Sequence, residues 1–98
     1  MFDVATTAEF DNWLSRLKDN VGKAKIVARI RRLSLGNPGS VRAVGEGVSE
    51  LKIDFGPGYR VYYKQTGKQT VLILGGGDKD SQENDIAQAK ALAAKLKG

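Results

Sequence analysis

The chain has 98 residues, with 16 Lys and Arg against 11 Asp and Glu, which gives a formal net charge of +5. It contains neither histidine nor cysteine, which excludes disulfides, thiolate or imidazole metal sites and serine-histidine-aspartate triads. This length predicts one domain over residues 1–98. No metal or other cofactor is expected.

The basic charge and the first residues bear on partners and location. A field of this sign attracts polyanions such as nucleic acid, or an acidic protein. No apolar run reaches about 18 residues, so no membrane span is expected. The opening segment MFDVA lacks the basic and apolar stretches of a secretory signal, which favours the cytoplasm.

The first half of the chain predicts a strand followed by two helices. Phe2–Ala5 has the pattern of a short strand, and Thr6 with Glu9 has the spacing of a capping box, which places the start of the first helix there. Asn20 and Gly22 are expected to end that helix. Its apolar residues recur at helical spacing and are expected in the core: Phe10, Trp13, Leu14 and Leu17.

A second helix is expected from about Val21 or Lys23 to Leu35, where the glycines and proline of residues 36–39 stop it. Its predicted buried stripe is Ile26, Val27, Ile30 and Leu33. Three cations share the opposite side, namely Lys25, Arg29 and Arg32. This basic stripe is either a solvated helix surface or a binding site for a polyanion.

The second half of the chain predicts strands and a last helix. From Val41 onward apolar residues alternate with polar ones, and two half-buried strands flank the Gly-Pro-Gly of residues 56–58. Thr70–Leu74 is a continuous apolar run, typical of a central strand that is covered on both faces. Residues 75–80 predict a flexible turn that carries Lys79, and Ser81 suits the start of a helix.

The predicted order is β-α-α-β-β-β-α, an α+β fold. Two N-terminal helices pack on one face of a small, mostly antiparallel sheet. The C-terminal helix has an alanine-rich side that could pack either on the body or on a partner.

The hairpin around residues 56–58 brings several polar side chains to one face. If the loop closes symmetrically, Phe55 faces Tyr59 and cross-strand partners share a face. The face would then be either solvated charge pairs or an open concave surface for a phosphodiester, with Lys79 beside it. The expected pairs are Asp54 with Arg60, Lys52 with Tyr62, and Glu50 with Lys64.

The runs ELKIDFGPGYRVYY and LILGGGDKDSQENDIAQA follow the two-helix segment. Together they closely resemble the toxins of type II toxin-antitoxin modules in the RelE/ParE superfamily, in the HigB-like group called addiction module killer proteins. The resemblance covers essentially the whole chain. It implies a RelE-like fold and a ribosome-dependent, metal-independent mRNA endoribonuclease that inhibits translation. It also implies a cognate antitoxin, commonly a helix-turn-helix protein.

The resemblance also implies roles for individual residues. Arg60 would hold the scissile phosphate, Lys52 would activate or stabilise the attacking group, and Lys79 would act at the leaving oxygen or the phosphate. The pairing argument adds Tyr62, which would stack on or orient a nucleotide. The remaining candidates for binding the substrate are cationic: Lys64, Arg42, Lys25, Arg29 and Arg32.

Two departures from the family pattern keep alternatives open. Asp54 stands where the best-studied ribonucleases of the family have a second lysine, and no tyrosine lies near Ile86 in the C-terminal segment. One alternative is a ParE-like toxin that binds DNA gyrase and cleaves nothing. The other is a catalytically inactive protein that binds its antitoxin.

Overall fold

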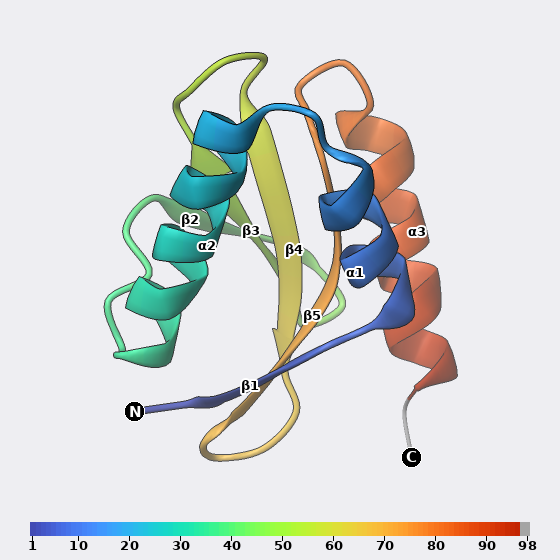
Figure 1. The fold of residues 1–98 in the computed structure, drawn as a ribbon. Coiled ribbons are helices and arrows are strands. Elements are labelled where there is room, and N and C mark those ends of the chain that lie inside the picture. The colour runs from blue at the N-terminus through green and yellow to red at the C-terminus, as the bar shows by residue number, and fades with distance from the viewer. Residues whose placement is uncertain (97–98) are drawn as a thin grey trace.

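A computed structural model gives the structure of the protein and describes residues 1–96. Five strands form one sheet in the order β1-β5-β4-β3-β2, antiparallel except for the parallel pair β1 and β5. Helices α1 and α2 cover one face and α3 covers the other (Figure 1). The elements are β1 (Asp3–Thr6), α1 (Ala8–Arg16), α2 (Asn20–Ser34), β2 (Val41–Gly45), β3 (Val48–Ile53), β4 (Tyr59–Gln65), β5 (Thr70–Gly77) and α3 (Gln82–Lys95).

The predicted α+β class and the packing of two N-terminal helices on one sheet face are confirmed. The C-terminal helix packs on the body, on the face opposite to α1 and α2 (Figure 1). Within residues 1–96, no helix combines the length and the apolar character that crossing a membrane requires.

The first helix is capped by Thr7 and not by Thr6, so the predicted capping box is wrong by one residue. Thr6 belongs to β1, where it pairs with Ile73. The Thr7 hydroxyl accepts a hydrogen bond from the Phe10 amide at 3.2 Å and donates to the Ile73 carbonyl at 3.0 Å. This buried threonine therefore starts α1 and also ties it to β5.

The second helix starts earlier than predicted, because Asp19 caps it by accepting from the Gly22 amide at 2.9 Å. Gly22 is thus part of the first turn of α2 and not a break. A Cβ on Gly22 would lie 2.6 Å from the ring of Tyr59, so a side chain there would push α2 off the sheet. Val27 was predicted to be buried but is 53% exposed, because it lies outside the stripe of residues 22, 26, 30 and 33 that faces the sheet.

Each face of the sheet has its own core. On the α1 and α2 face the buried residues include Phe10, Ile26, Leu33, Leu51, Val61 and Ile73. On the α3 face they are Val48, Tyr62, Leu74, Ala89 and Ala93. Since α3 supplies small alanines to the second core, it lies close to the sheet and covers strands that the sequence analysis expected to be open.

The structure contains one strand more than predicted. The segment from Val41 forms two antiparallel strands, β2 and β3, joined at Gly45, Glu46 and Gly47. These three residues have φ values of 108°, 55° and 79°, a conformation that two glycines make accessible. The alternation of apolar and polar residues from Val41 onward predicts strands, but it does not reveal this additional hairpin.

The register of the β3 and β4 hairpin differs from the prediction by two residues. Ile53 pairs with Tyr59, and Lys52 pairs with Arg60. Phe55 leaves the strand to pack against the first core, and the Nζ of Lys25 lies 5.0 Å from the centre of its ring. A slip of two residues keeps every side chain on its face, so the predicted faces hold although the predicted partners do not.

Candidate phosphate-binding site

The centre of the candidate site is an ion pair between Arg60 on β4 and Glu50 on β3. The Nε of Arg60 donates to Oε1 of Glu50 at 3.0 Å, and its Nη1 donates to the Gly58 carbonyl at 2.7 Å. The Arg60 side chain is 8% exposed and that of Glu50 is 2% exposed. Two anchors on a nearly buried guanidinium fix its plane and direction.

The Glu50 carboxylate is shared by three elements. Besides Arg60, it accepts from the Nε and Nη2 of Arg42 on β2 at 3.2 and 3.1 Å. The Nε2 of Gln82, the first residue of α3, lies 3.1 Å from both carboxylate oxygens. With these donors around it, the carboxylate has no free position for a further proton donor. Glu50 therefore organises the cations and is not available as a base.

A pocket of about 290 Å³ opens beside this network. Arg42, Lys52 and Arg60 each line it, together with Glu50 and Gln82. Because β2, β3, β4 and the start of α3 all contribute to its wall, the pocket depends on the sheet register and on the position of α3.

Lys79, in the connection between β5 and α3, lies next to the same network. Its backbone amide donates to the Pro57 carbonyl at 3.4 Å. A Cβ on Gly58 would lie 3.2 Å from Nη1 of Arg60 and 3.5 Å from the Cβ of Lys79. Gly58 is thus the point at which Lys79 and Arg60 meet.

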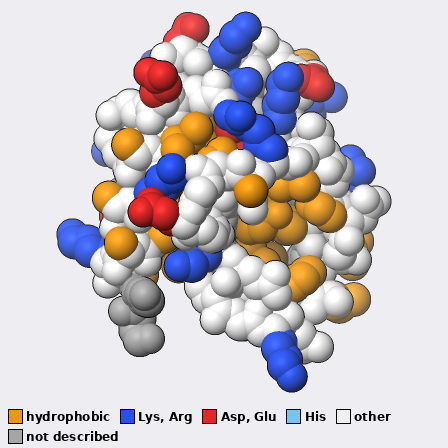
Figure 2. All heavy atoms as spheres, turned by 180° about the vertical axis from the view of Figure 1, so that it is seen from behind, with side chains coloured by type: hydrophobic (Ala, Val, Ile, Leu, Met, Phe, Trp, Pro, Cys, Tyr) orange, Lys and Arg blue, Asp and Glu red, His pale blue; other side chains and the backbone are white. Residues whose placement is uncertain are grey.

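Arg42, Lys52, Arg60 and Lys79 are called the basic cluster below. Two of its four positive charges, those of Arg42 and Arg60, pair with the single negative charge of Glu50, so the cluster and Glu50 together have a net charge of +3. Asp54 lies 3.6 Å from the Nζ of Lys52, but both side chains are at least half exposed, and such pairs are screened by water and salt. Figure 2 shows cationic side chains gathered over the upper part of the face seen from behind.

The expectation of an open sheet face was wrong for Tyr62. Its side chain is 0% exposed, since it belongs to the core beneath α3. Its hydroxyl has no hydrogen-bond partner within residues 1–96. Burial raises the pKa of Tyr62, and the nearby Glu50 carboxylate raises it further. A buried neutral phenol cannot stack on a nucleotide, so Tyr62 is a core residue.

The expectation of an uncovered Arg60 was also wrong. As a whole residue it is only 6% exposed, because Glu50 holds it and the start of α3 lies over it. The cations that can meet a ligand first are Arg42, Lys52 and Lys79, which are exposed. The site is a narrow pocket at the N-terminal end of α3 and not a concave sheet surface.

The other predicted cations lie elsewhere. Lys64 pairs across the sheet with Val48 and lines a separate cavity near the end of α3. The stripe on α2 is on the opposite face, where Arg29 donates to the carbonyls of Lys52, Pro38 and Ser40 at 2.6, 2.8 and 3.0 Å. Arg29 therefore holds the loop after α2 in place. Lys25 lies over Phe55, and Arg32 stays exposed on α2.

Glu50 and Gln82 were not predicted as site residues. Glu50 was expected to pair with Lys64, and the register error hid its position between two arginines. Its alternation with Lys52 on one strand was the available signal. Gln82 had no such signal, because its role follows only from the packing of α3. Within residues 1–96, no group of three or more acidic side chains forms a metal site.

A protein of Haemophilus influenzae, described as uncharacterized, is 53% identical to this chain over 93 residues. The match covers 95% of this chain and 94% of that protein. The chain belongs to the same family as that protein. No family model matches the chain. Since the match spans nearly the whole of both proteins, this family shares a complete domain and not a short motif.

Proposed function

We propose that the protein is the toxin of a type II toxin-antitoxin module and cleaves messenger RNA on the ribosome without a metal ion. The observation that supports this proposal is the basic cluster: Arg42, Lys52 and Arg60 line one pocket, and a buried carboxylate orients the two arginines. Preorganised donors of this kind stabilise charge that develops on phosphorus. The resemblance to HigB-like toxins supplies the substrate class.

The pocket suits attack by a ribose 2′-hydroxyl on the adjacent phosphate. Arg60 lines the pocket with a guanidinium whose Nε and one N–H of Nη1 are already engaged, so the second N–H of Nη1 and those of Nη2 are the donors left for a phosphate oxygen. Lys52 and Arg42 add charge at the pocket wall. Together they would hold the two non-bridging oxygens as the phosphorus becomes five-coordinate.

Proton transfer needs an acceptor and a donor. We assign the acceptor to Asp54, an exposed carboxylate next to Lys52, since Glu50 is fully engaged. The 2′-hydroxyl loses its proton to Asp54 as the bond from the 2′-oxygen to phosphorus forms. The bond to the 5′-oxygen breaks, and Lys79 gives that oxygen a proton. The products are a 2′,3′-cyclic phosphate and a 5′-hydroxyl end.

The partners follow from this activity. The ribosome and its bound message are the substrate complex, and a cognate antitoxin with a helix-turn-helix domain would hold the toxin inactive. The place of action would be the cytoplasm. The antitoxin would neutralise the cluster by covering the exposed side chains of Arg42, Lys52 and Lys79.

A second candidate function is binding without cleavage, either to gyrase, as ParE-like toxins do, or to an antitoxin alone. The observation that favours it is the near-complete burial of Arg60, together with the loss of Tyr62 as a substrate contact. In that case the cluster would recognise an acidic surface and no bond would break.

The first experiment compares induced expression of three proteins and maps transcript ends on ribosome-bound messages. The wild type should arrest growth and produce new 5′-hydroxyl ends. The double variant Lys52→Ala with Lys79→Ala should lower cleavage by more than about 100-fold, since the loss of even one such donor costs about 3 kcal/mol of transition-state stabilisation. The control is Lys68→Ala, an exposed lysine in the turn before β5, which should behave as the wild type.

Other outcomes identify the alternatives. Growth arrest with a DNA damage response and blocked supercoiling, but without new transcript ends, would replace the nuclease by a gyrase inhibitor. Normal growth of cells that contain the folded protein would leave only the antitoxin-binding function.

A further inference from the structure

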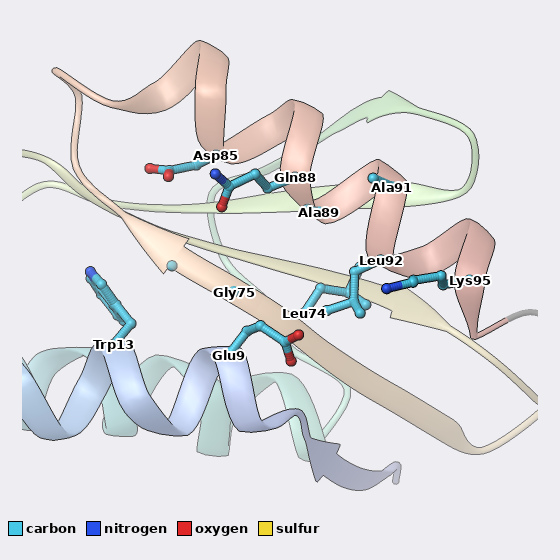
Figure 3. Close-up of a pocket in the computed structure, with 11 residues that line it drawn as sticks. Glu9, Trp13, Leu74, Gly75, Asp85, Gln88, Ala89, Ala91, Leu92 and Lys95 are labelled. Carbon is cyan, nitrogen blue, oxygen red and sulfur yellow. The ribbon is translucent and has the colours of Figure 1, made fainter.

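A second cavity, of about 520 Å³, lies between α1 and α3 (Figure 3). Its floor is the end of β5, and the side chains of Glu9 and Trp13 rise toward it from α1 while those of Gln88 and Leu92 come from α3. No residue of the basic cluster lines it. The cavity is therefore a separate site, called the α1–α3 groove below.

The floor of the groove is a strand edge with no neighbour. β1 pairs with β5 only from Thr70 to Ile73 and then leaves the sheet, where Thr7 caps α1. β4 continues to pair with β5 as far as Gly77. Residues 74–77 thus have β4 on one side and no strand on the other within residues 1–96. The Thr7 hydroxyl donates to the Leu74 carbonyl at 3.0 Å, so the free part of this edge is residues 75–77, whose backbone donors and acceptors can pair with another chain.

The glycines of β5 keep this edge open. A Cβ on Gly75 would meet no atom within 4 Å, so there is empty space above it. A Cβ on Gly76 would collide with the Trp13 ring, and one on Gly77 would collide with the Asp85 carboxylate. The two helices therefore lie directly over the strand at its end, one on each face, with the bare edge between them.

We propose that the α1–α3 groove binds an extended segment of a partner protein, which adds a strand to the edge of β5. Strand addition uses the backbone of the edge for affinity and the neighbouring walls for specificity. Side chains of an added strand alternate between the two faces. They would meet Glu9 and Trp13 on one side, and Gln88 and Leu92 on the other.

The walls define the preferred segment. The Glu9 carboxylate and the Trp13 ring lie at separate positions along the α1 wall (Figure 3), and each favours a cationic side chain such as arginine. Lys95 points into the groove from α3, so the cation is expected on the α1 side. Leu92 and Ala89 favour an apolar residue on the α3 side. The expected segment is therefore an alternating run with apolar residues on one side and a basic residue on the other.

The outer edge of β2 is the other open edge of the sheet, but it is protected. Its register shifts between Ala43 and Gly45, and a bulge of this kind twists an edge away from further pairing. The pocket beside it is walled mainly by strand residues and Gln82 and not by two helices. The edge of β5 is the better site because it is enclosed.

Intrinsic fluorescence tests the proposal, since Trp13 is the single tryptophan of the chain. The probe is a capped pentapeptide, acetyl-Thr-Val-Arg-Val-Thr-amide, added to the full-length protein. Binding should change the Trp13 emission and slow hydrogen exchange at the Gly75 to Gly77 amides. The same peptide N-methylated at alternate residues lacks the donors for a ladder and should not bind.

Peptide binding to two variants completes the test, measured by amide chemical shifts and therefore independently of the Trp13 fluorescence. Ala91 lines the groove and is exposed, whereas Ala87 is exposed on the same helix but does not line it. Ala91→Phe should weaken peptide binding by at least about 10-fold, which is 1.4 kcal/mol, while Ala87→Phe should leave it unchanged. Both substitutions lie on the surface, so both variants should fold.

Three results would overturn the proposal. The first is the absence of binding by peptides with arginine, glutamate or threonine at the centre. These peptides are tested at about 1 mM, because that concentration detects even a weak complex. The second is binding that survives N-methylation or is equal in the two variants. The third is a dimer formed through the groove, detected by light scattering, which would make a second copy the occupant. The inference does not depend on the nuclease, and each of these results is independent of cleavage.

Discussion

Arg60 and Glu50 form an ion pair that is almost withdrawn from solvent, with Arg42 and Gln82 around the same carboxylate. Removing one partner of a buried pair leaves an uncompensated charge and costs about 3–5 kcal/mol. Substitution of Arg60 therefore tests stability and function together. For this reason the functional tests use Lys52 and Lys79, which are exposed.

Tyr62 gives a cleaner test at the scale of one residue. Its buried hydroxyl has no hydrogen-bond partner among residues 1–96, and an unpaired buried polar group costs free energy. Tyr62→Phe should raise the free energy of unfolding in urea by about 1 kcal/mol and leave cleavage of messages unchanged. A loss of activity in a stable Tyr62→Phe protein would mean that the Tyr62 hydroxyl contacts the substrate.

The same variant makes a prediction about pH. The pKa of Tyr62 is raised above its ordinary value of 10.0, chiefly by burial. A raised pKa means that the fold disfavours the ionised phenolate, so the free energy of unfolding is unaffected by this group below pH 10 and falls as the pH rises further. The alkaline fall in stability should therefore be smaller in Tyr62→Phe than in the wild type. Tyr59 and Tyr63 also have raised pKa values and would continue to contribute in both proteins.

The sequence was enough to predict which residues form the cluster, but not how buried they are. Arg60, Lys52 and Lys79 were predicted together, and the structure places Lys52 and Arg60 at one pocket and Lys79 beside Arg60 at Gly58. Their burial could not be predicted, because the exposure of a strand face depends on whether a distant helix covers it. Tyr62 alternates in the sequence as a solvent-facing residue would, and only α3 makes it part of a core.

At the scale of an element, the end of β5 shows how glycines set the distance between layers. The sequence analysis predicted that Gly75, Gly76 and Gly77 form a flexible turn, but they continue the strand. The prediction was wrong because glycine is usually a turn residue, whereas here it allows Trp13 and Asp85 to approach the backbone from opposite faces.

Alanine substitutions in β5 test this account. Gly75→Ala should be tolerated and could gain up to about 1 kcal/mol, because alanine lowers the entropic cost of ordering a strand. Gly76→Ala and Gly77→Ala should each lose about 1–3 kcal/mol, because the new methyl groups displace Trp13 or Asp85. The free energies come from urea unfolding of the three variants. Equal effects at all three positions would contradict the close approach of the two helices.

The hairpin register belongs to this scale too. The Gly-Pro-Gly segment favours a symmetric loop, but Phe55 is apolar and packs against the core on the α1 and α2 face instead of pairing with Tyr59. That choice lengthens the loop to residues 54–58 and slips the pairing by two residues. The faces survive because the strand period is two. Local turn chemistry alone could not reveal the competition between pairing and burial.

At the scale of the whole molecule, the positive charge divides between the two faces of the sheet. The basic cluster lies on the α3 face, and Lys25, Arg29 and Arg32 lie on the α2 side. The sequence showed a net charge of +5 and predicted the fold class correctly, but it could not show which cations share a surface. A polyanion that binds the cluster would leave the α2 stripe free.

This division permits a direct test of the central claim, that the basic cluster holds a phosphodiester. The measurement is a nuclear magnetic resonance titration of the labelled protein with a uridine dinucleotide whose 2′-hydroxyl is methylated, so that it binds without being cleaved. The account predicts that the side-chain Nε signals of Arg42 and Arg60 shift together with the amides of Lys52, Gly58 and Lys79, and that the shifts weaken as salt is added. Shifts confined to Arg29 and Arg32 on α2, or none at all, would contradict it.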